Sequence, residues 1–309
     1  MVAASGEQYA LSFSSSQGEL RAIIAQVGAS LRVFDIDDIE LVEPYGEDQV
    51  KPLCAGAIMA PWVNRLDGGM WAYRGEQLHN PINIAEQQNA NHGLLLDHAY
   101  VAEEKTGSAV TLRATIEPST GYPFHVDTWV KYELSESGLT VTHRAINRSG
   151  EAAPYATGAH PYFKFSDVAT SELTLSSHAG TQTVVDDRQI PVSTRPTVGT
   201  ECDLRDGFRV GDRCLDEDFT DLPLGSDGNA HVYLTTPDGR GLDVWQDSTF
   251  KHVVIFTPSF FPSADGSPVY AAAIEPSTAA PNAFNSGDDL IWLEPEDEFQ
   301  ARWGVRINL

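Results

Sequence analysis

Alternating apolar and polar residues are the dominant pattern along the chain. In Ala109–Glu117 the even positions are apolar, and threonine and arginine occupy odd positions between them. The same period of two runs through Phe124–Leu134 and Gly138–Asn147. A period of two places successive side chains on opposite faces, so each segment is predicted to be a half-buried antiparallel strand.

Turn residues separate the predicted strands at short intervals. Glu136–Gly138 lies between two of them, and Pro237–Gly239 lies between His231–Thr236 and Gly241–Gln246, which predicts a hairpin. The chain holds 25 glycines and 18 prolines, and no long amphipathic helix stands out between them. Many short strands with turn signals are typical of a β-sandwich or a barrel.

No linker, low-complexity segment or change of composition divides the chain. We therefore predict a single all-β domain over residues 1–309, built as a large antiparallel β-sandwich. A chain of this length buries a sizeable core without disulfide or metal cross-links.

The charge pattern limits the partners. The formal net charge is -24, from 44 acidic and 20 basic residues, and no basic run occurs. Such a field repels nucleic acid and anionic membrane surfaces. The sequence shows neither an apolar run long enough to span a bilayer nor a signal peptide, which predicts a cytoplasmic protein. An acidic, lysine-poor composition fits a host with high internal salt as well as an ordinary one.

Metal and cofactor motifs are absent from the sequence. The three cysteines form no CxxC pair, and the nine histidines show no HxH or HxxxH spacing, so no zinc site and no disulfide framework is predicted. Cys54, Cys202 and Cys214 are expected to fill the core. The nucleophile elbow GxSxG, the P-loop and GxGxxG are also missing. We therefore expect neither a metal nor a cofactor.

Two stretches break the alternation and concentrate polar and aromatic residues. They are Ala60–Leu96 and Ala156–Phe165, and side chains of this kind on loops of a β-scaffold are frequent in functional sites. The second stretch contains His160, which precedes a proline. Glu275 follows the apolar run 269–274, where partial burial would make its carboxylate a stronger base. A histidine and a glutamate suffice to move protons without a metal or a nucleophile.

Five short motifs occur in a fixed order: PWVNR at 61–65, NHG at 91–93, GAHPYF at 158–163, CLDEDF at 214–219, and IEPST with a following PNA at 274–283. Each motif is weak alone. Together they resemble the aldose 1-epimerase, or mutarotase, family over nearly the whole chain, from Gly28 to Arg306. The resemblance implies the galactose mutarotase-like β-supersandwich, which agrees with the sandwich predicted from the alternation.

The resemblance also implies roles for five residues. Glu275 would be the general base that takes the proton of the anomeric hydroxyl, and His160 would be the general acid that protonates the ring oxygen. The ring would open to the aldehyde and close on the other face of the carbonyl, with the roles reversed. Arg65, His92 and Asp216 would hold sugar hydroxyls or help to polarise the ring oxygen. This chemistry needs no cofactor.

The sequence departs from the family pattern near one of these residues. Many members carry two glycines after the histidine, whereas here His92 is followed by Gly93 and three leucines. Phosphosugar epimerases should line their cleft with extra arginines, and here only Arg65 lies in a motif. We therefore expect an unphosphorylated aldose as the small-molecule partner. Residues 166–213 receive no function, and the sequence leaves the identity of the sugar and the oligomeric state open.

Four of the five site residues also have a purely structural interpretation. His160 could cap a turn before the proline, Glu275 could be a surface acid at a strand end, and Arg65 could pair with Asp67. Asp216 lies in an acidic run that is typical of a solvated loop. The presence of all five motifs in one chain favours the functional interpretation.

Two other functions compete with a mutarotase. A sugar-binding or sensing module of the same fold would tolerate the loss of His160 or Glu275, so the presence of both favours an enzyme. A glycoside hydrolase needs two carboxyl groups about 5–9.5 Å apart, and Glu275 with Asp216 could supply them. Trp62 and Trp245 could stack on a sugar ring, although aromatic residues on strands more often belong to the core.

Overall fold

The largest sheet of the computed structural model, which describes residues 3–263 and 266–309, has nine strands. Neighbouring strands of this sheet run antiparallel. Their order across the sheet is β10 (Val101–Lys105), β11 (Ala109–Ile116), β12 (Val126–Ser135), β13 (Gly138–Asn147), β29 (Glu298–Asn308), β23 (Gly241–Asp247), β22 (Asn229–Thr235), β17 (Thr174–Ser177) and β20 (Phe208–Arg209).

A second, eight-stranded sheet is also antiparallel and carries much of the polar chemistry described below. Its order is β19 (Pro191–Pro196), β18 (Thr181–Val185), β21 (Asp216–Thr220), β24 (His252–Phe256), β27 (Ala272–Ser277), β15 (Gly158–Ala159) and β5 (Ile58–Met59), and β16 (Tyr162–Phe163) also pairs with β27.

Smaller elements complete the fold. A four-stranded sheet consists of β1 (Gln8–Ser15), β2 (Gly18–Ala25), β3 (Ser30–Ile36) and β4 (Ile39–Glu40). Four strand pairs are β6 (Arg65–Asp67) with β9 (Asn89–Asn91), β7 (Met70–Tyr73) with β8 (Glu76–His79), β14 (Ala153–Tyr155) with β28 (Ile291–Leu293), and β25 (Phe261–Pro262) with β26 (Pro268–Val269). The helical turns are η1 (Pro52–Cys54), η2 (Thr170–Glu172), η3 (Val210–Asp212) and α1 (Ala283–Ser286).

The all-β class predicted from the alternation is confirmed, and so are the individual strands. β13 has the predicted bounds, and β11, β12, β22 and β23 differ from the predicted segments by at most two residues at either end. From Thr128 to Ser135, buried residues alternate with half-buried ones, as a strand with one face in the core requires. The predicted hairpin is present, because Thr235 pairs with Gly241 across the turn.

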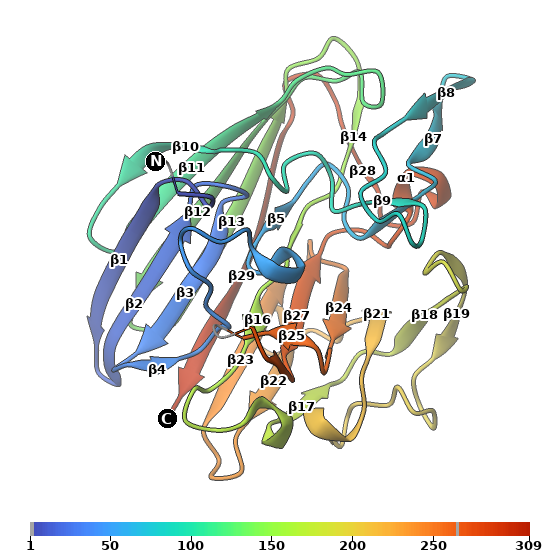
Figure 1. Ribbon diagram of the computed structural model, residues 1–309. Helices are drawn as coiled ribbons and strands as arrows, with labels where there is room; N and C mark the ends of the chain where they lie inside the picture. Colours follow the sequence, from blue (N-terminus) through green and yellow to red (C-terminus); the bar gives the residue numbers. More distant parts are fainter. Residues whose placement is uncertain (1–2, 264–265) are drawn as a thin grey trace.

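The core lies between the nine-stranded sheet and the two other large sheets. In Figure 1 the blue strands β1–β3 lie beside the green strands β10–β13, and β1 and β2 pack against β11 and β12. Val253 and Ile255 of β24 belong to the same apolar cluster as Val141 of β13 and Trp303 of β29. Because side chains alternate along β24, Val254 must point to the opposite face of the sheet.

A buried polar link joins the two largest sheets. The imidazole of His143, on β13, lies 2.8 Å from the hydroxyl of Thr157 through its Nδ1, and its Nε2 accepts from the indole of Trp303 at 3.0 Å. Since Nε2 is an acceptor, Nδ1 carries the proton and donates to Thr157. Burial lowers the pKa of His143 to about 3, which keeps the ring neutral. Thr157 directly precedes β15, so this link fixes the segment that carries His160.

The cysteines correct one expectation. Cys202 is buried, but Cys54 is only partly buried and Cys214 is exposed, so only one of the three fills the core. Cys214 lies in the connection that leads into β21, outside the apolar cluster. None of the helices in the described ranges is long and apolar enough to cross a membrane.

An ion cluster lies on the face of the eight-stranded sheet that points away from the core. His252 of β24 pairs with Asp218 of β21 at 3.0 Å and with Asp289 at 3.1 Å, and the first two residues are buried. Thr183 donates to Asp218 at 2.6 Å. Burial alone would lower the pKa of His252, but the two carboxylates outweigh it and raise the pKa to about 9.

We expect the free energy of unfolding to fall as the pH rises from about 6.5 towards about 9. An unfolded histidine loses its proton near the lower value, whereas His252 keeps it in the folded protein. The stabilisation is therefore complete below the unfolded pKa and disappears as the pH approaches the folded one. Urea denaturation across this range measures the slope.

The substitution His252→Gln should weaken this pH dependence. The fall in the free energy of unfolding across the range should be smaller by an amount on the order of a few kcal/mol. The exposed His79 provides a control, and His79→Gln should keep the wild-type slope. Equal slopes in the wild type and His252→Gln would show that the cluster does not hold the proton.

Candidate active site

The first two site residues lie on a short strand pair. Arg65 begins β6, which pairs with β9, and His92 follows the last residue of β9. The amide of His92 donates to the carbonyl of Asn64 at 2.9 Å. Gly93 has a φ of +81°, and a Cβ there would lie 2.0 Å from the carbonyl oxygen of Ala60. This close approach requires glycine directly after His92, and Gly93 alone satisfies the requirement, without the second glycine that many family members carry.

His160 directly follows β15, which lies between β27 and the edge strand β5, and backbone hydrogen bonds hold it there. Its amide donates to Ala57 at 3.0 Å, and its carbonyl accepts from Gly56 at 2.8 Å. The ring stacks on Tyr162, with centroids 5.0 Å apart and an angle of 26° between the planes. The backbone bonds and the stacking together restrict where the imidazole can point.

Glu275 and Asp216 come from neighbouring parts of the same sheet. Glu275 lies in β27 opposite Val254 of β24, on the face that points away from the core, and is only 2% exposed. Asp216 is the first residue of β21, where it pairs with Phe256. Its carboxylate is partly accessible, with 30% of the side chain exposed.

The structure brings His160 and Glu275 into direct contact. The Nε2 atom of His160 lies 3.3 Å from Oε1 of Glu275. The ring of His92 meets that of His160 edge-on, with centroids 5.1 Å apart and the planes at 84°. Three segments that are far apart in the sequence therefore place two imidazoles and a carboxyl group together.

Arg65 does not pair with Asp67, the partner that a purely structural role would give it. It pairs with Asp216 at 3.1 Å and also donates to Gln87 and Asn64, each at 3.1 Å. Asp67, the alternative partner, pairs instead with Arg188 at 2.8 Å. The guanidinium of Arg65 is thus fixed at the site rather than at a surface turn.

All five predicted residues line one cavity of about 390 Å³. Other lining residues were not predicted from the sequence to belong to the site: Leu53, Cys54, Asn64, Asn83, Ile84, Asn91, Leu96, Asp97, Tyr162 and Phe256. Tyr162 could have been found from its motif, because it follows His160 by two residues. Phe256 ends a buried apolar strand, and nothing in that run distinguishes it from a core residue.

The two tryptophans considered as sugar platforms do not line this cavity. Trp62 is 4% exposed and packs against Phe284, with ring centroids 5.8 Å apart. Trp245, on β23, lies beneath the guanidinium of Arg306 at 5.5 Å. Both serve packing, as aromatic residues on strands commonly do.

Burial dominates the protonation of the site. Burial, together with the charge of Arg65, lowers the pKa of His160 to about 3. It also lowers the pKa of His92 and raises that of Glu275 well above its ordinary value, and Asp216 adds to the rise. A carboxylate beside an imidazole favours the imidazolium, but at His160 the loss of solvation outweighs that effect.

The segment 166–213, which had no function from sequence, helps to shape the cavity. Arg188, in the turn between β18 and β19, donates to the carbonyls of Gln87 and Gln88 and to the side chain of Asn89. Gln87 in turn binds Arg65. The β18–β19 hairpin therefore steadies the loop that positions the guanidinium.

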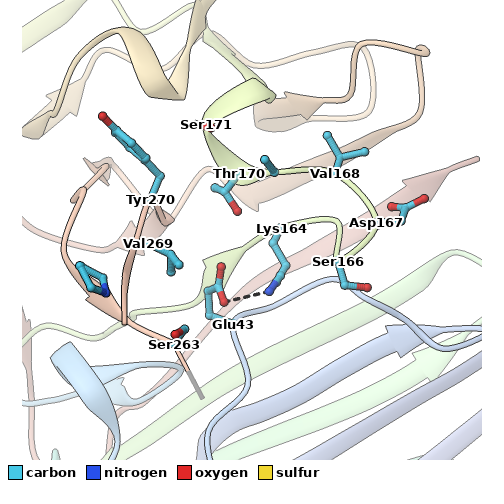
Figure 2. A pocket seen from close by; sticks show the side chains of 12 residues that line it. Glu43, Lys164, Ser166, Asp167, Val168, Thr170, Ser171, Ser263, Val269 and Tyr270 are labelled. Carbon is cyan, nitrogen blue, oxygen red and sulfur yellow. Dashed lines mark hydrogen bonds and ion pairs between the residues drawn. The ribbon is translucent and has the colours of Figure 1, made fainter. Parts of the chain in front are cut away.

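Two further cavities lack a comparable acid–base pair. One, of about 490 Å³, contains Lys164, which donates to Glu43 at 3.0 Å, and no histidine is among its described lining residues (Figure 2). The other, of about 660 Å³, includes His252, whose two ring nitrogens are already bound by Asp218 and Asp289. Proton transfer to a ligand is best supported in the cavity of His160 and Glu275.

Comparison with known proteins identifies the family of the chain. The family model described as aldose 1-epimerase matches residues 12–306. An uncharacterized protein of Escherichia coli, YihR, is 29% identical over 282 residues, which cover 91% of this chain and 88% of that protein. Rat galactose mutarotase is 28% identical over 165 residues, which cover 50% of this chain and 46% of that enzyme.

Solved structures show the same fold. The GalM/aldose epimerase homologue from C. elegans superimposes with a TM-score of 0.83 at 17% identity, covering 98% of this chain and 100% of that one. Galactose 1-epimerase from Lactobacillus acidophilus gives a TM-score of 0.77 at 18% identity, covering 98% and 99% of the two chains. The predicted supersandwich is confirmed, and the family model extends over nearly the whole chain. The chain belongs to the aldose 1-epimerase family.

Proposed function

We propose that this protein is a mutarotase that interconverts the α and β anomers of an unphosphorylated aldose. The observation that carries the proposal is the contact of 3.3 Å between His160 and Glu275 inside a cavity of about 390 Å³. The family supports an epimerase, and the galactose mutarotases among the relatives support a hexose as the substrate.

In the proposed reaction, two side chains exchange protons with the sugar. Glu275 takes the proton from the anomeric hydroxyl while His160 donates one to the ring oxygen. The bond between C1 and the ring oxygen breaks, and C1 becomes an aldehyde carbon. Rotation about C1–C2 exposes the other face of the carbonyl, and the reverse transfers close the ring. Each group ends the cycle in its starting protonation state, so protein side chains alone balance the reaction.

Burial fits this exchange. Opening the ring leaves a protonated Glu275 and a neutral His160, which are the forms that burial favours. Before ring opening the pair also holds one proton, on His160, and that proton is the one passed to the ring oxygen. Because His160 and Glu275 lie 3.3 Å apart, they can reach the anomeric hydroxyl and the ring oxygen of one sugar at the same time. The pair of His160 and Glu275 therefore holds one proton both in the empty cavity and during the reaction, and only the residue that carries the proton differs.

Arg65, His92 and Asp216 are proposed to bind the sugar. The guanidinium and the carboxylate are held together at 3.1 Å and present donors and acceptors at one side of the cavity. Arg65 is the one permanently charged cation among the described lining residues, and Asp216 already neutralises it. A phosphate group would lack an unpaired cation here, which favours a neutral sugar.

Polarimetry with freshly dissolved α-glucose and α-galactose tests the proposal. The wild type should relax the rotation faster than buffer does. Glu275→Gln and His160→Asn should each lower the turnover number by about 100-fold or more, because each removes one proton carrier. Matched substitutions outside the cavity, Glu298→Gln and His125→Asn, should leave the rate unchanged, and thermal melting checks that all variants fold.

The negative outcomes separate the alternatives. A wild type that binds either sugar by saturation-transfer NMR but relaxes neither would be a sugar-binding module. Release of reducing sugar from a nitrophenyl glycoside would point to hydrolysis by Glu275 and Asp216. Full activity in both site variants would refute the assignment of the proton carriers.

Arg65 and Asp216 should act as a coupled pair in sugar binding. We expect Arg65→Met and Asp216→Asn each to raise KM by roughly tenfold with a smaller effect on turnover, because each removes a hydrogen-bonding group that binds ground state and transition state alike. Initial rates across sugar concentrations give both constants.

The double variant should lose less than the two single variants combined. The pair is in contact, so a coupling energy on the order of 1 kcal/mol is expected in kcat/KM. Additive losses would mean that the ion pair does not organise the binding site.

A further inference from the structure

Three site side chains match the donor set of a zinc site. His92, His160 and Glu275 are buried, and one ligand atom of each lies within 4.8 Å of the other two. Two imidazoles and a carboxylate, with a fourth position left open, form one of the common arrangements around protein-bound zinc. The spacing of histidines in the sequence gave no hint of this, because the three residues come from separate segments.

We propose that this cavity binds a divalent transition-metal ion such as Zn²⁺, and that the bound ion inhibits the protein by occupying the proton carriers. The binding stands on geometry alone. The inhibition goes beyond the proposed function and rests on it, because an ion held by His160 and Glu275 blocks both proton transfers and competes with the sugar.

Binding of a zinc ion would require little movement of the three side chains. Donor atoms on one tetrahedral zinc lie about 3.3 Å apart, given metal–ligand bonds of about 2.0–2.2 Å. The separation of His160 Nε2 and Glu275 Oε1 is already 3.3 Å. Only the ring of His92 has to approach, from a separation of at most 4.8 Å. The fourth position faces the cavity, where a water molecule can complete the tetrahedron.

The charges around the cluster select the type of ion. Glu275 supplies one negative charge to a bound cation, and the ion pair with Asp216 cancels the opposing charge of Arg65. Imidazole nitrogens suit zinc, nickel and copper, whereas magnesium and calcium take oxygen ligands. We therefore expect Zn²⁺ to bind and Mg²⁺ to have no effect.

The ring nitrogens of His92 and His160 that would not bind the ion limit the affinity of the site for zinc. Nδ1 of His92 and Nδ1 of His160 are buried without a hydrogen-bond partner. In dedicated metal sites this nitrogen usually donates to a carboxylate or a carbonyl, and loss of such a partner weakens binding by about 10–100-fold. The expected affinity is micromolar, which suits a reversible inhibitor that EDTA removes.

Calorimetric titration with ZnCl₂ and the visible spectrum of added Co²⁺ measure binding without relying on activity. The EDTA-treated wild type should bind one ion per chain. His92→Gln and Glu275→Gln should each weaken binding by about tenfold or more, since each removes a ligand. His231, which contacts Asp227 and Asp243 outside the cavity, supplies the control, and His231→Gln should bind as the wild type does.

Activity then tests the inhibition. Zn²⁺ should slow mutarotation competitively with sugar, EDTA should restore the rate, and Mg²⁺ should leave it unchanged. Unchanged zinc affinity in both His92→Gln and Glu275→Gln, or an EDTA-treated enzyme that needs zinc for activity, would overturn the inference. An anomalous zinc peak between the three side chains in wild-type crystals decides the site if a variant does not fold.

The two proposals can fail separately. A protein that binds zinc at this site but relaxes neither sugar, with or without EDTA, refutes the mutarotase while leaving the metal site in place. A protein that relaxes sugars and does not bind zinc refutes the metal site alone.

Discussion

The contact between the Glu275 carboxyl and the His160 imidazole is the constraint on which the rest of the site depends. The two atoms lie 3.3 Å apart, and both side chains are almost completely buried. Burial of an ionisable group favours its neutral form, and here it acts on an acid and a base that face each other. The pair can therefore hold one proton in two positions, which is the property that ring opening and closing of a sugar requires.

The fold keeps this pair in place through the sheet beneath it. The inward side chains of β24 and β27 pack in the main core, so the alternate residues, Glu275 among them, must face the cavity. The link from His143 to Thr157 and Trp303 ties the approach to β15 to the nine-stranded sheet. Neither support touches the cavity, yet both determine where His160 and Glu275 lie.

The surrounding polar groups bear on the kind of sugar that we propose the cavity binds. Arg65 is neutralised by Asp216 and held by Gln87, and the β18–β19 hairpin holds Gln87 through Arg188. Such an arrangement suits the hydroxyl groups of a neutral sugar. On our two proposals, the same convergence of two imidazoles and a carboxylate would also offer a transition-metal ion a place to bind, and proton transfer at this site would be sensitive to metals.

The sequence by itself determined the all-β class, the bounds of the strands from β11 to β13 to within two residues, and the order of five motifs whose residues line one cavity. Alternation is a local property, and it survives in any fold that buries one face of a strand. Only the tertiary structure decided that Arg65 pairs with Asp216 rather than Asp67, that Phe256 lines the cavity, and that His92 approaches His160. These contacts join segments far apart in the chain, and the direction of the pKa shift at His160 depends on burial, which neither spacing nor composition reveals.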